Sequence, residues 1–137
     1  MNCSLCFIPK EQQYRVIYEN ENIFVCVCLD AMTDSHLMIL PKRHVTKLDD
    51  LTADESKMIL VTVEKMSILL KRKFNTKGSV TLMNHHELKS QDHIHFHMVA
   101  SDSSQRDFVT GYLKVPARER QSPEKLKQIA DEIKKAL

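Results

Sequence analysis

The chain has 137 residues, of which 42% are hydrophobic and 28% are charged, a balance typical of a folded globular protein rather than a disordered or fibrous one. This length fits one hydrophobic core, so we expect a single domain over residues 1–137. The 20 basic and 18 acidic residues are interspersed, which disfavours a nucleic-acid polymer as partner and is compatible with a small anionic ligand.

The cysteines bear on compartment and on metal binding. No apolar run approaches the roughly 20 residues of a membrane helix, and the start of the chain lacks a secretory signal, so we expect a cytoplasmic or nuclear protein without a membrane partner. In such a reducing compartment Cys3 and Cys6 are expected to be thiols that can bind a metal. Cys26 and Cys28 lie among apolar residues and are interpreted as buried small hydrophobic residues instead.

The first predicted elements are strands. Two runs rich in β-branched and aromatic residues, 14–18 and 23–29, flank the polar residues 19–22, which predicts a hairpin. Residues 36–40 predict a third strand, which Pro41 ends.

A long helix is predicted over residues 52–74. Thr52 and Glu55 have the spacing of a capping box, in which each side chain accepts a hydrogen bond from the other residue's backbone. Behind them, Met58, Thr62, Met66 and Leu69 recur at helical spacing, flanked by Ile59, Val63 and Leu70. This stripe fits either packing within the chain or an interface between two copies.

Two further strands are predicted over residues 79–83 and 93–99, and a charged C-terminal helix over about 122–137. The order of elements predicts an α+β fold, with an antiparallel or mixed sheet of about five strands, one long central helix and a C-terminal helix. The chain has only 2 glycines, which excludes a glycine-rich phosphate loop. Any phosphate chemistry must therefore use side chains.

Histidines alternate with apolar residues from position 93 to 98. In a strand, His93, His95 and His97 would share one face at a spacing of about 6 to 7 Å, while the residues between them face a core. Imidazole suits both metal ligation and nucleophilic or acid–base catalysis near neutral pH. Spacing alone does not choose between these roles, and a surface strand without function is the plain alternative.

Cys3 and Cys6 have the spacing of half a tetrahedral zinc site. No second close cysteine pair follows, so the best placed further ligands are His44 and one histidine of the 93–97 row. A pair of free thiols is one alternative. A redox pair is disfavoured, because the motif does not follow a strand and open a helix. A zinc ion that keeps one position open for water is a further alternative.

These motifs together resemble the histidine triad (HIT) family. Its defining pattern, His-x-His-x-His followed by two apolar residues, matches residues 93–99. Residues 36–44 are similar to a family strand that ends in Pro-Lys-x-His, and residues 48–55 to the start of the family's central helix. The resemblance runs over nearly the whole chain.

The resemblance implies a mechanism in which the middle histidine attacks the α-phosphorus of a nucleotide derivative, and this role would fall to His95. His97 would donate a hydrogen bond to the phosphoryl oxygens. Ser90 matches the residue that contacts the leaving group. Asp30 matches the residue that binds the ribose hydroxyls, and Asn84 the asparagine at the mouth of the phosphate site.

Two further positions concern substrate choice. His36 matches a family histidine that we expect behind the reacting groups. Residues 84–90 depart from the family, because they contain no glycine and place Lys89 where a glutamine is usual. The resemblance implies a hydrolase or nucleotidyl transferase for purine nucleoside phosphoramidates or dinucleoside polyphosphates. A nucleotide-binding or partner-binding module with little turnover is the alternative.

The cysteine pair is similar to that of the family's zinc-containing branch. This likeness implies a structural zinc held by Cys3, Cys6, His44 and His93, with no open position. The N-terminal segment 1–10 would then be held against the catalytic histidines, and His95 would remain free to react. The family also implies a homodimer around the central helix.

Overall fold

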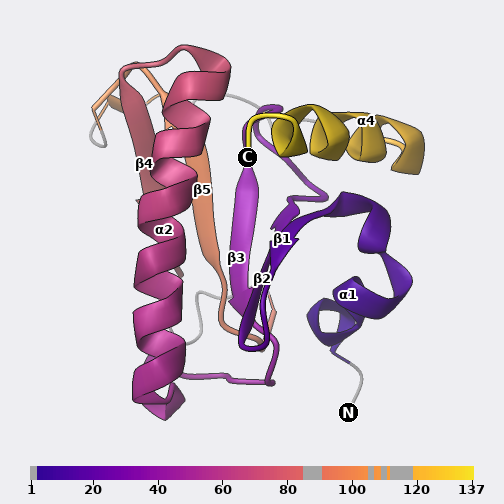
Figure 1. The fold of residues 1–137 in the computed structure, drawn as a ribbon, viewed down its shortest axis with the longest axis vertical. Helices are drawn as coiled ribbons and strands as arrows, with labels where there is room; N and C mark the ends of the chain where they lie inside the picture. Colours follow the sequence, from indigo (N-terminus) through magenta and orange to yellow (C-terminus); the bar gives the residue numbers. More distant parts are fainter. Residues whose placement is uncertain (1–2, 85–90, 105–106, 109–110, 112–118) are drawn as a thin grey trace.

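The computed structural model describes residues 3–84, 91–104, 107–108, 111 and 119–137 (Figure 1). Within these residues five strands form one sheet in the order β1-β2-β3-β5-β4, and all neighbours are antiparallel. The strands are β1 Val16–Glu19, β2 Ile23–Val27, β3 Leu37–Pro41, β4 Gly78–Leu82 and β5 Phe96–Ser101. With the long helix and the C-terminal helix described below, this sheet confirms the predicted α+β fold.

Helix α2, Ala53–Phe74, begins at the predicted capping box. Thr52 Oγ1 accepts the Glu55 N–H at 3.1 Å, and the Glu55 carboxylate accepts the Thr52 N–H at 2.8 Å. The helix ends at Asn75, whose left-handed backbone with φ of 53° provides a C-cap. No helix in the described ranges has both the length and the apolar character that crossing a membrane requires.

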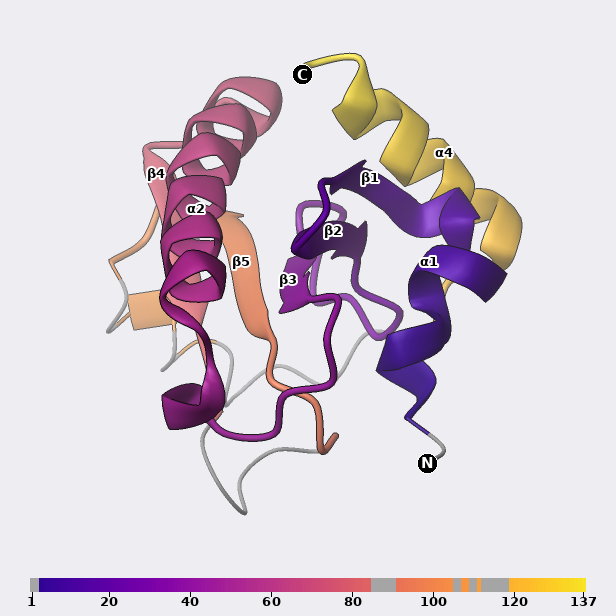
Figure 2. The ribbon, with the colours of Figure 1, turned by 60° about the horizontal axis from the view of Figure 1, so that its bottom comes forward.

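Helices α2 and α4, Pro123–Lys134, pack on one face of the sheet (Figures 1 and 2). Met66 and Leu69 of the predicted stripe are buried there, so the stripe packs within the chain rather than between copies. The predicted charged C-terminal helix is also a core element, since its Leu126, Ala130 and Ile133 are fully buried.

The N-terminal segment packs on the opposite face of the sheet. It forms three short helical elements that the sequence patterns did not predict: η1 Ser4–Phe7, α1 Ile8–Glu11 and η2 Gln13–Arg15. Leu5 and Ile8 belong to a second buried cluster together with Cys26 and Cys28 of the hairpin. The strand predicted from Tyr14 therefore starts two residues later, because its first two residues complete η2.

The strand predicted over residues 93–99 also begins later than expected. Residues 93–95 precede β5, and the Ile94 N–H donates to the carbonyl of Val45 at 2.7 Å instead of joining the sheet. Of the three alternating histidines, only His97 lies in the regular strand. His93 and His95 are buried and His97 is half-buried, so the predicted row of three equivalent imidazoles is wrong.

Candidate active site and metal centre

Four potential metal ligands meet between the N-terminal turn, the loop after β3 and the residues before β5. The ligand atoms of Cys3, Cys6, His44 and His93 all lie within 4.8 Å of one another. Cys6 Sγ is 3.3 Å from Nδ1 of both histidines, and Cys3 Sγ is 3.6 Å from His93 Nδ1. Sulfur and nitrogen ligands of a tetrahedral zinc are about 3.5 Å apart. The cluster therefore fits zinc in both donor type and spacing.

The Cys6 thiol is protonated at neutral pH when no cation is present. Burial, reinforced by the adjacent Cys3 thiol, raises the pKa of Cys6 to about 11. Two close thiolates in a partly buried place need a positive charge between them, and a bound metal deprotonates the thiols that coordinate it. The chemistry of the donor set therefore agrees with its geometry.

The ring of His93 is oriented by a backbone carbonyl. Its Nε2–H donates to the carbonyl of Pro41 at 2.9 Å, so Nδ1 carries the lone pair on the side of the cysteines. An imidazole that ligates a metal through one nitrogen and donates through the other is the usual arrangement of such sites. Because His93 is fully buried, this tautomer does not exchange partners with solvent.

The loop that carries His44 is tied to the start of α2. Arg43 Nε and Nη2 donate to the two carboxylate oxygens of Glu55 at 2.9 and 2.8 Å, and Nη2 also donates to the carbonyl of Asp50. The guanidinium lowers the pKa of Glu55 to about 2, so this capping-box carboxylate is ionised at neutral pH. One side-chain pair thus fixes both the helix start and the ligand loop.

The tautomer of His95 is also set by the backbone. Its Nδ1 lies 2.8 Å from the carbonyl oxygen of His93, and a carbonyl can only accept, so Nδ1 carries a proton; in the neutral ring Nε2 then has the lone pair. His95 is 6% exposed. Within the described part of the chain, no hydrogen bond involves its Nε2. A neutral imidazole with an open ring nitrogen has the form of a nucleophile.

A chain of hydrogen bonds leads from the backbone of Met32 through His36 to His97. The Met32 N–H donates to His36 Nδ1 at 3.0 Å, so the neutral His36 ring carries its proton on Nε2. That Nε2–H donates to His97 Nδ1 at 2.8 Å, which places the proton of a neutral His97 on its Nε2. The ring of His97 lies edge-on to His95, with centroids 4.8 Å apart. His97 can therefore donate a hydrogen bond beside the open nitrogen of His95.

Both of these histidines are neutral at pH 7. Burial, with a smaller contribution from the neighbouring imidazoles, lowers the pKa of His36 to about 3 and that of His97 to about 4. Neutral rings are what the chain of donors requires, because a protonated His36 could not accept from Met32. His36 thus lies next to His97 in this chain of hydrogen bonds, and its role behind the reacting groups stays a prediction.

A cavity of about 470 Å³ opens over these histidines. His36, His95 and His97 line it together with Asp30 and Asn84, so the structure brings these five predicted residues to one place. Its walls also contain the apolar side chains of Leu5, Ile8, Leu29, Met32 and Met38. A cavity in which apolar walls and several polar side chains converge can hold a small molecule with both kinds of surface.

Two residues of the cavity carry features that the sequence did not predict. Arg120 Nε donates to Asp30 Oδ1 at 2.6 Å, and this ion pair lowers the pKa of Asp30. Cys28 is buried as predicted, but it also borders the cavity, with its Sγ within 4.8 Å of ring nitrogens of His36 and His97. No local motif marks Arg120, which lies 90 residues from its partner. Ser90 and Lys89, the other predicted site residues, lie outside the described residues.

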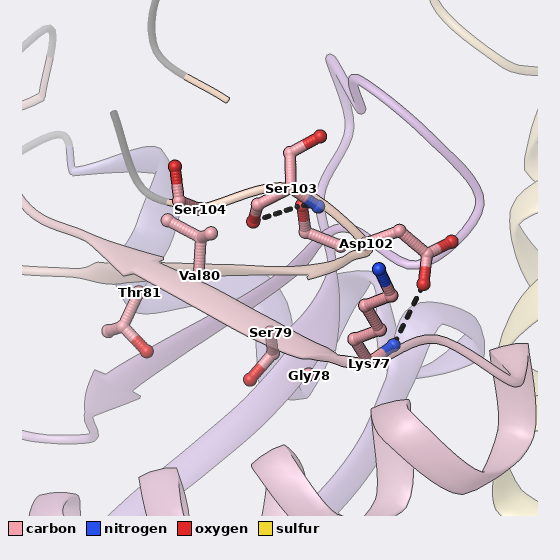
Figure 3. Close-up of a pocket in the computed structure, with 9 residues that line it drawn as sticks. Lys77, Gly78, Ser79, Val80, Thr81, Asp102, Ser103 and Ser104 are labelled. Atoms are coloured by element: carbon pink, nitrogen blue, oxygen red, sulfur yellow. Dashed lines mark hydrogen bonds between the residues drawn. The ribbon is translucent and has the colours of Figure 1, made fainter. Parts of the chain in front are cut away.

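A second hollow, of about 390 Å³, lies at the ends of β4 and β5 (Figure 3). Lysine, serine and threonine side chains line it, and the backbone N–H of Lys77 donates to the Asp102 carboxylate at 2.8 Å. None of the described lining residues is a histidine or a cysteine. His36, His95 and His97 line the other cavity instead.

A search against protein-family models matches residues 9–104 to the HIT domain. The match covers more than half of the chain, and its matched range includes His36, His44 and the three alternating histidines. The protein belongs to the HIT family. Cys3 and Cys6 precede the matched range, so the cluster of four potential metal ligands connects the matched domain to the segment before it.

Related proteins share this fold along most of the chain. An adenosine 5'-monophosphoramidase from Schizosaccharomyces pombe is 26% identical over 137 residues, which cover 97% of this chain and 96% of that protein. A histidine triad nucleotide-binding protein from Sulfolobus tokodaii has a TM-score of 0.78 at 19% identity, covering 98% of this chain and 91% of that one. A Zn-bound histidine triad family protein from Mycobacterium smegmatis has a TM-score of 0.75 at 18% identity, covering 99% and 93%.

The four potential metal ligands lead to a testable prediction. Purified protein should contain one zinc per chain, and Cys6→Ser should lose most of it and unfold at a lower temperature, because the energy of binding a structural zinc adds to that of folding. Metal analysis and thermal denaturation measure both. Cys26→Ser, which alters a buried thiol outside the cluster, should keep the zinc. Full zinc retention in Cys6→Ser would contradict the four-ligand site.

Proposed function

We propose that this HIT protein is a nucleotide hydrolase or nucleotidyl transferase that acts through a covalent nucleotidyl-histidine on His95. The observation that carries the proposal is the hydrogen bond from His95 Nδ1 to the His93 carbonyl, which leaves Nε2 as the lone-pair nitrogen beside the cavity. The relative named as an adenosine 5'-monophosphoramidase supports a purine nucleoside phosphoramidate as substrate. A dinucleoside polyphosphate is the second substrate class that the same chemistry fits.

In the first step, His95 Nε2 attacks the α-phosphorus. The bond from phosphorus to the leaving nitrogen or oxygen breaks, and the leaving group departs with the electron pair and takes up a proton from solvent. The His95 ring becomes cationic, and the His93 carbonyl stabilises it by accepting from Nδ1–H. In the second step, water attacks the same phosphorus and loses a proton to solvent, the P–N bond breaks with its electron pair returning to Nε2, and the nucleoside monophosphate leaves a neutral imidazole.

The neighbouring groups would act on the phosphoryl oxygens and the ribose. His97 would donate through Nε2–H to an oxygen on which negative charge develops, with His36 holding the ring in place. Asp30 would bind the ribose hydroxyls beside its ion pair with Arg120, and Asn84 would lie at the mouth of the phosphate site. Ser90 and Lys89 are proposed on the leaving-group side by family resemblance alone.

Zinc would have a structural role in this scheme. Cys3, Cys6, His44 and His93 provide four protein donors, which supports a closed coordination sphere rather than one with an open position for water. A bound zinc would hold the His93 ring, and the backbone carbonyl of His93 accepts a hydrogen bond from Nδ1–H of His95. The metal would thus act on catalysis by fixing the nucleophile in place.

The test of the nucleophile is His95→Gln. We expect this variant to lose at least about 10³-fold in turnover of an adenosine phosphoramidate, because the covalent step has no substitute, while it still binds nucleotide. Mass spectrometry of the quenched wild-type reaction should find a nucleotidyl adduct on His95. Unchanged zinc content and melting temperature in the variant provide the control for folding.

Turnover that survives in His95→Gln, or wild-type protein that binds nucleotide without any turnover or adduct, would contradict the proposal. The second result would instead favour the alternative of a binding module with little activity.

We also propose a homodimer, as the family resemblance implies. The buried stripe of α2 is used within the chain, but Leu60, Val61 and Ile68 on the same helix are 71%, 46% and 62% exposed. Such large apolar side chains favour coverage by a partner. Light scattering at micromolar concentration should give twice the chain mass, and Ile68→Lys should reduce it to the monomer, whereas Lys10→Gln, at an exposed position on α1, should not. A monomeric wild type would contradict this proposal.

A further inference from the structure

Arg15 is a buried cation without an adequate partner. It ends η2 and is only 2% exposed. Its Nε and Nη1 have no hydrogen-bond partner, and Nη2 reaches only the Cys26 Sγ at 4.0 Å, a weak acceptor, in the part of the chain that the structure describes. The Asp30 carboxylate interacts with this guanidinium electrostatically but accepts none of its N–H groups in the described residues. Since buried donors without acceptors destabilise a fold, a ligand that offers acceptors to Arg15 would compensate for them.

Arg15 also lines the cavity that contains the histidines. Around it, Leu5 and Ile8 pack in one buried cluster with Cys26 and Cys28, and Leu5, Ile8 and Cys28 line the cavity as well. The cavity thus has an apolar region that can accept a flat ring, with a cationic donor in its wall. A ring that carries hydrogen-bond acceptors on its edge would satisfy both features.

The pairing of the strands places Arg15 away from the phosphate chemistry. Cys26, which Arg15 contacts, is paired with Met38, and Met38 is paired with His97. Two strand spacings therefore separate Cys26 from His97, about 10 Å. A phosphate at His95 and His97 lies at one end of this span. The base of the same nucleotide would extend toward the other end, where Arg15 lies.

We propose that Arg15 recognises the edge of the base and makes the site selective for 6-oxopurines, guanine and hypoxanthine, over adenine. The O6 and N7 atoms of these bases are adjacent acceptors that match the donor fork of a guanidinium. In adenine an amino group stands in place of O6. This group is a donor, so it cannot accept a hydrogen bond from the guanidinium. This inference rests on the proposed nucleotide site, and it names the base that the site selects.

The direct test compares the binding of inosine monophosphate and adenosine monophosphate by calorimetry. The two nucleotides share ribose, phosphate and N7, so their difference reports on the base edge opposite Arg15. Wild-type protein should bind inosine monophosphate roughly tenfold or more tightly. The corresponding phosphoramidates should show the same preference in kcat/KM.

The variant Arg15→Met should bring this ratio close to one while turnover of the adenosine phosphoramidate persists. Its melting temperature should equal or exceed that of the wild type, because the change removes buried N–H donors that have no acceptor. Lys10→Met, the same loss of a cation at an exposed position on α1, should leave the ratio unchanged.

Three outcomes would overturn the inference. Equal binding of the two nucleotides by the wild type, or an unchanged ratio in Arg15→Met, would reject the role of Arg15 while His95-dependent turnover keeps the proposed function intact. If the wild type binds neither nucleotide, the proposed function and the inference are rejected together.

Discussion

The site depends on the two hydrogen bonds of His93, both of which involve backbone carbonyls. Its ring donates to Pro41, and its own carbonyl accepts from the ring of His95. Because a carbonyl cannot donate, each bond admits one tautomer: His93 directs Nδ1 to the cysteines, and His95 keeps Nε2 open. Through its ring His93 belongs to the cluster of potential metal ligands, and through its backbone carbonyl it orients the ring of His95. In the proposed function these two bonds would give the two histidines different roles.

The rest of the fold serves to hold that residue. The loop between β3 and α2 contributes Pro41, His44 and the Val45 carbonyl, and Arg43 anchors this loop to the capping box of α2. From the other side, the N-terminal turn brings the two cysteines to the same point. Two segments far apart in the sequence thus converge on His93. Loss of either would loosen the His93 ring and, through its carbonyl, the ring of His95.

The sequence predicted the elements with strong local signals. The capping box at Thr52, the apolar stripe behind it and the hairpin are set by neighbours within a few residues, and the structure agrees with them. The family motif also selected four side chains that meet as potential metal ligands. These predictions succeed because local spacing or a shared motif carries the information.

The remaining features depend on contacts between distant segments. Alternation of histidine and apolar residues predicted a strand from position 93, but Ile94 pairs with Val45 across the site, and no periodicity records that contact. The ion pair of Asp30 with Arg120 and the burial of Arg15 are equally invisible in a local pattern, since any arginine is expected at the surface. The positions of Arg15 and Arg120 in the cavity wall can be seen only in the three-dimensional structure.

The most direct measurement of the central claim is the tautomer of each histidine in the zinc-loaded protein. Long-range ¹H–¹⁵N NMR spectra at neutral pH distinguish a protonated ring nitrogen from one with a lone pair. The account predicts a proton on Nδ1 of His95 and on Nε2 of His97. A His95 ring that is protonated on Nε2, or on both nitrogens, would have no lone pair directed at phosphorus and would contradict it.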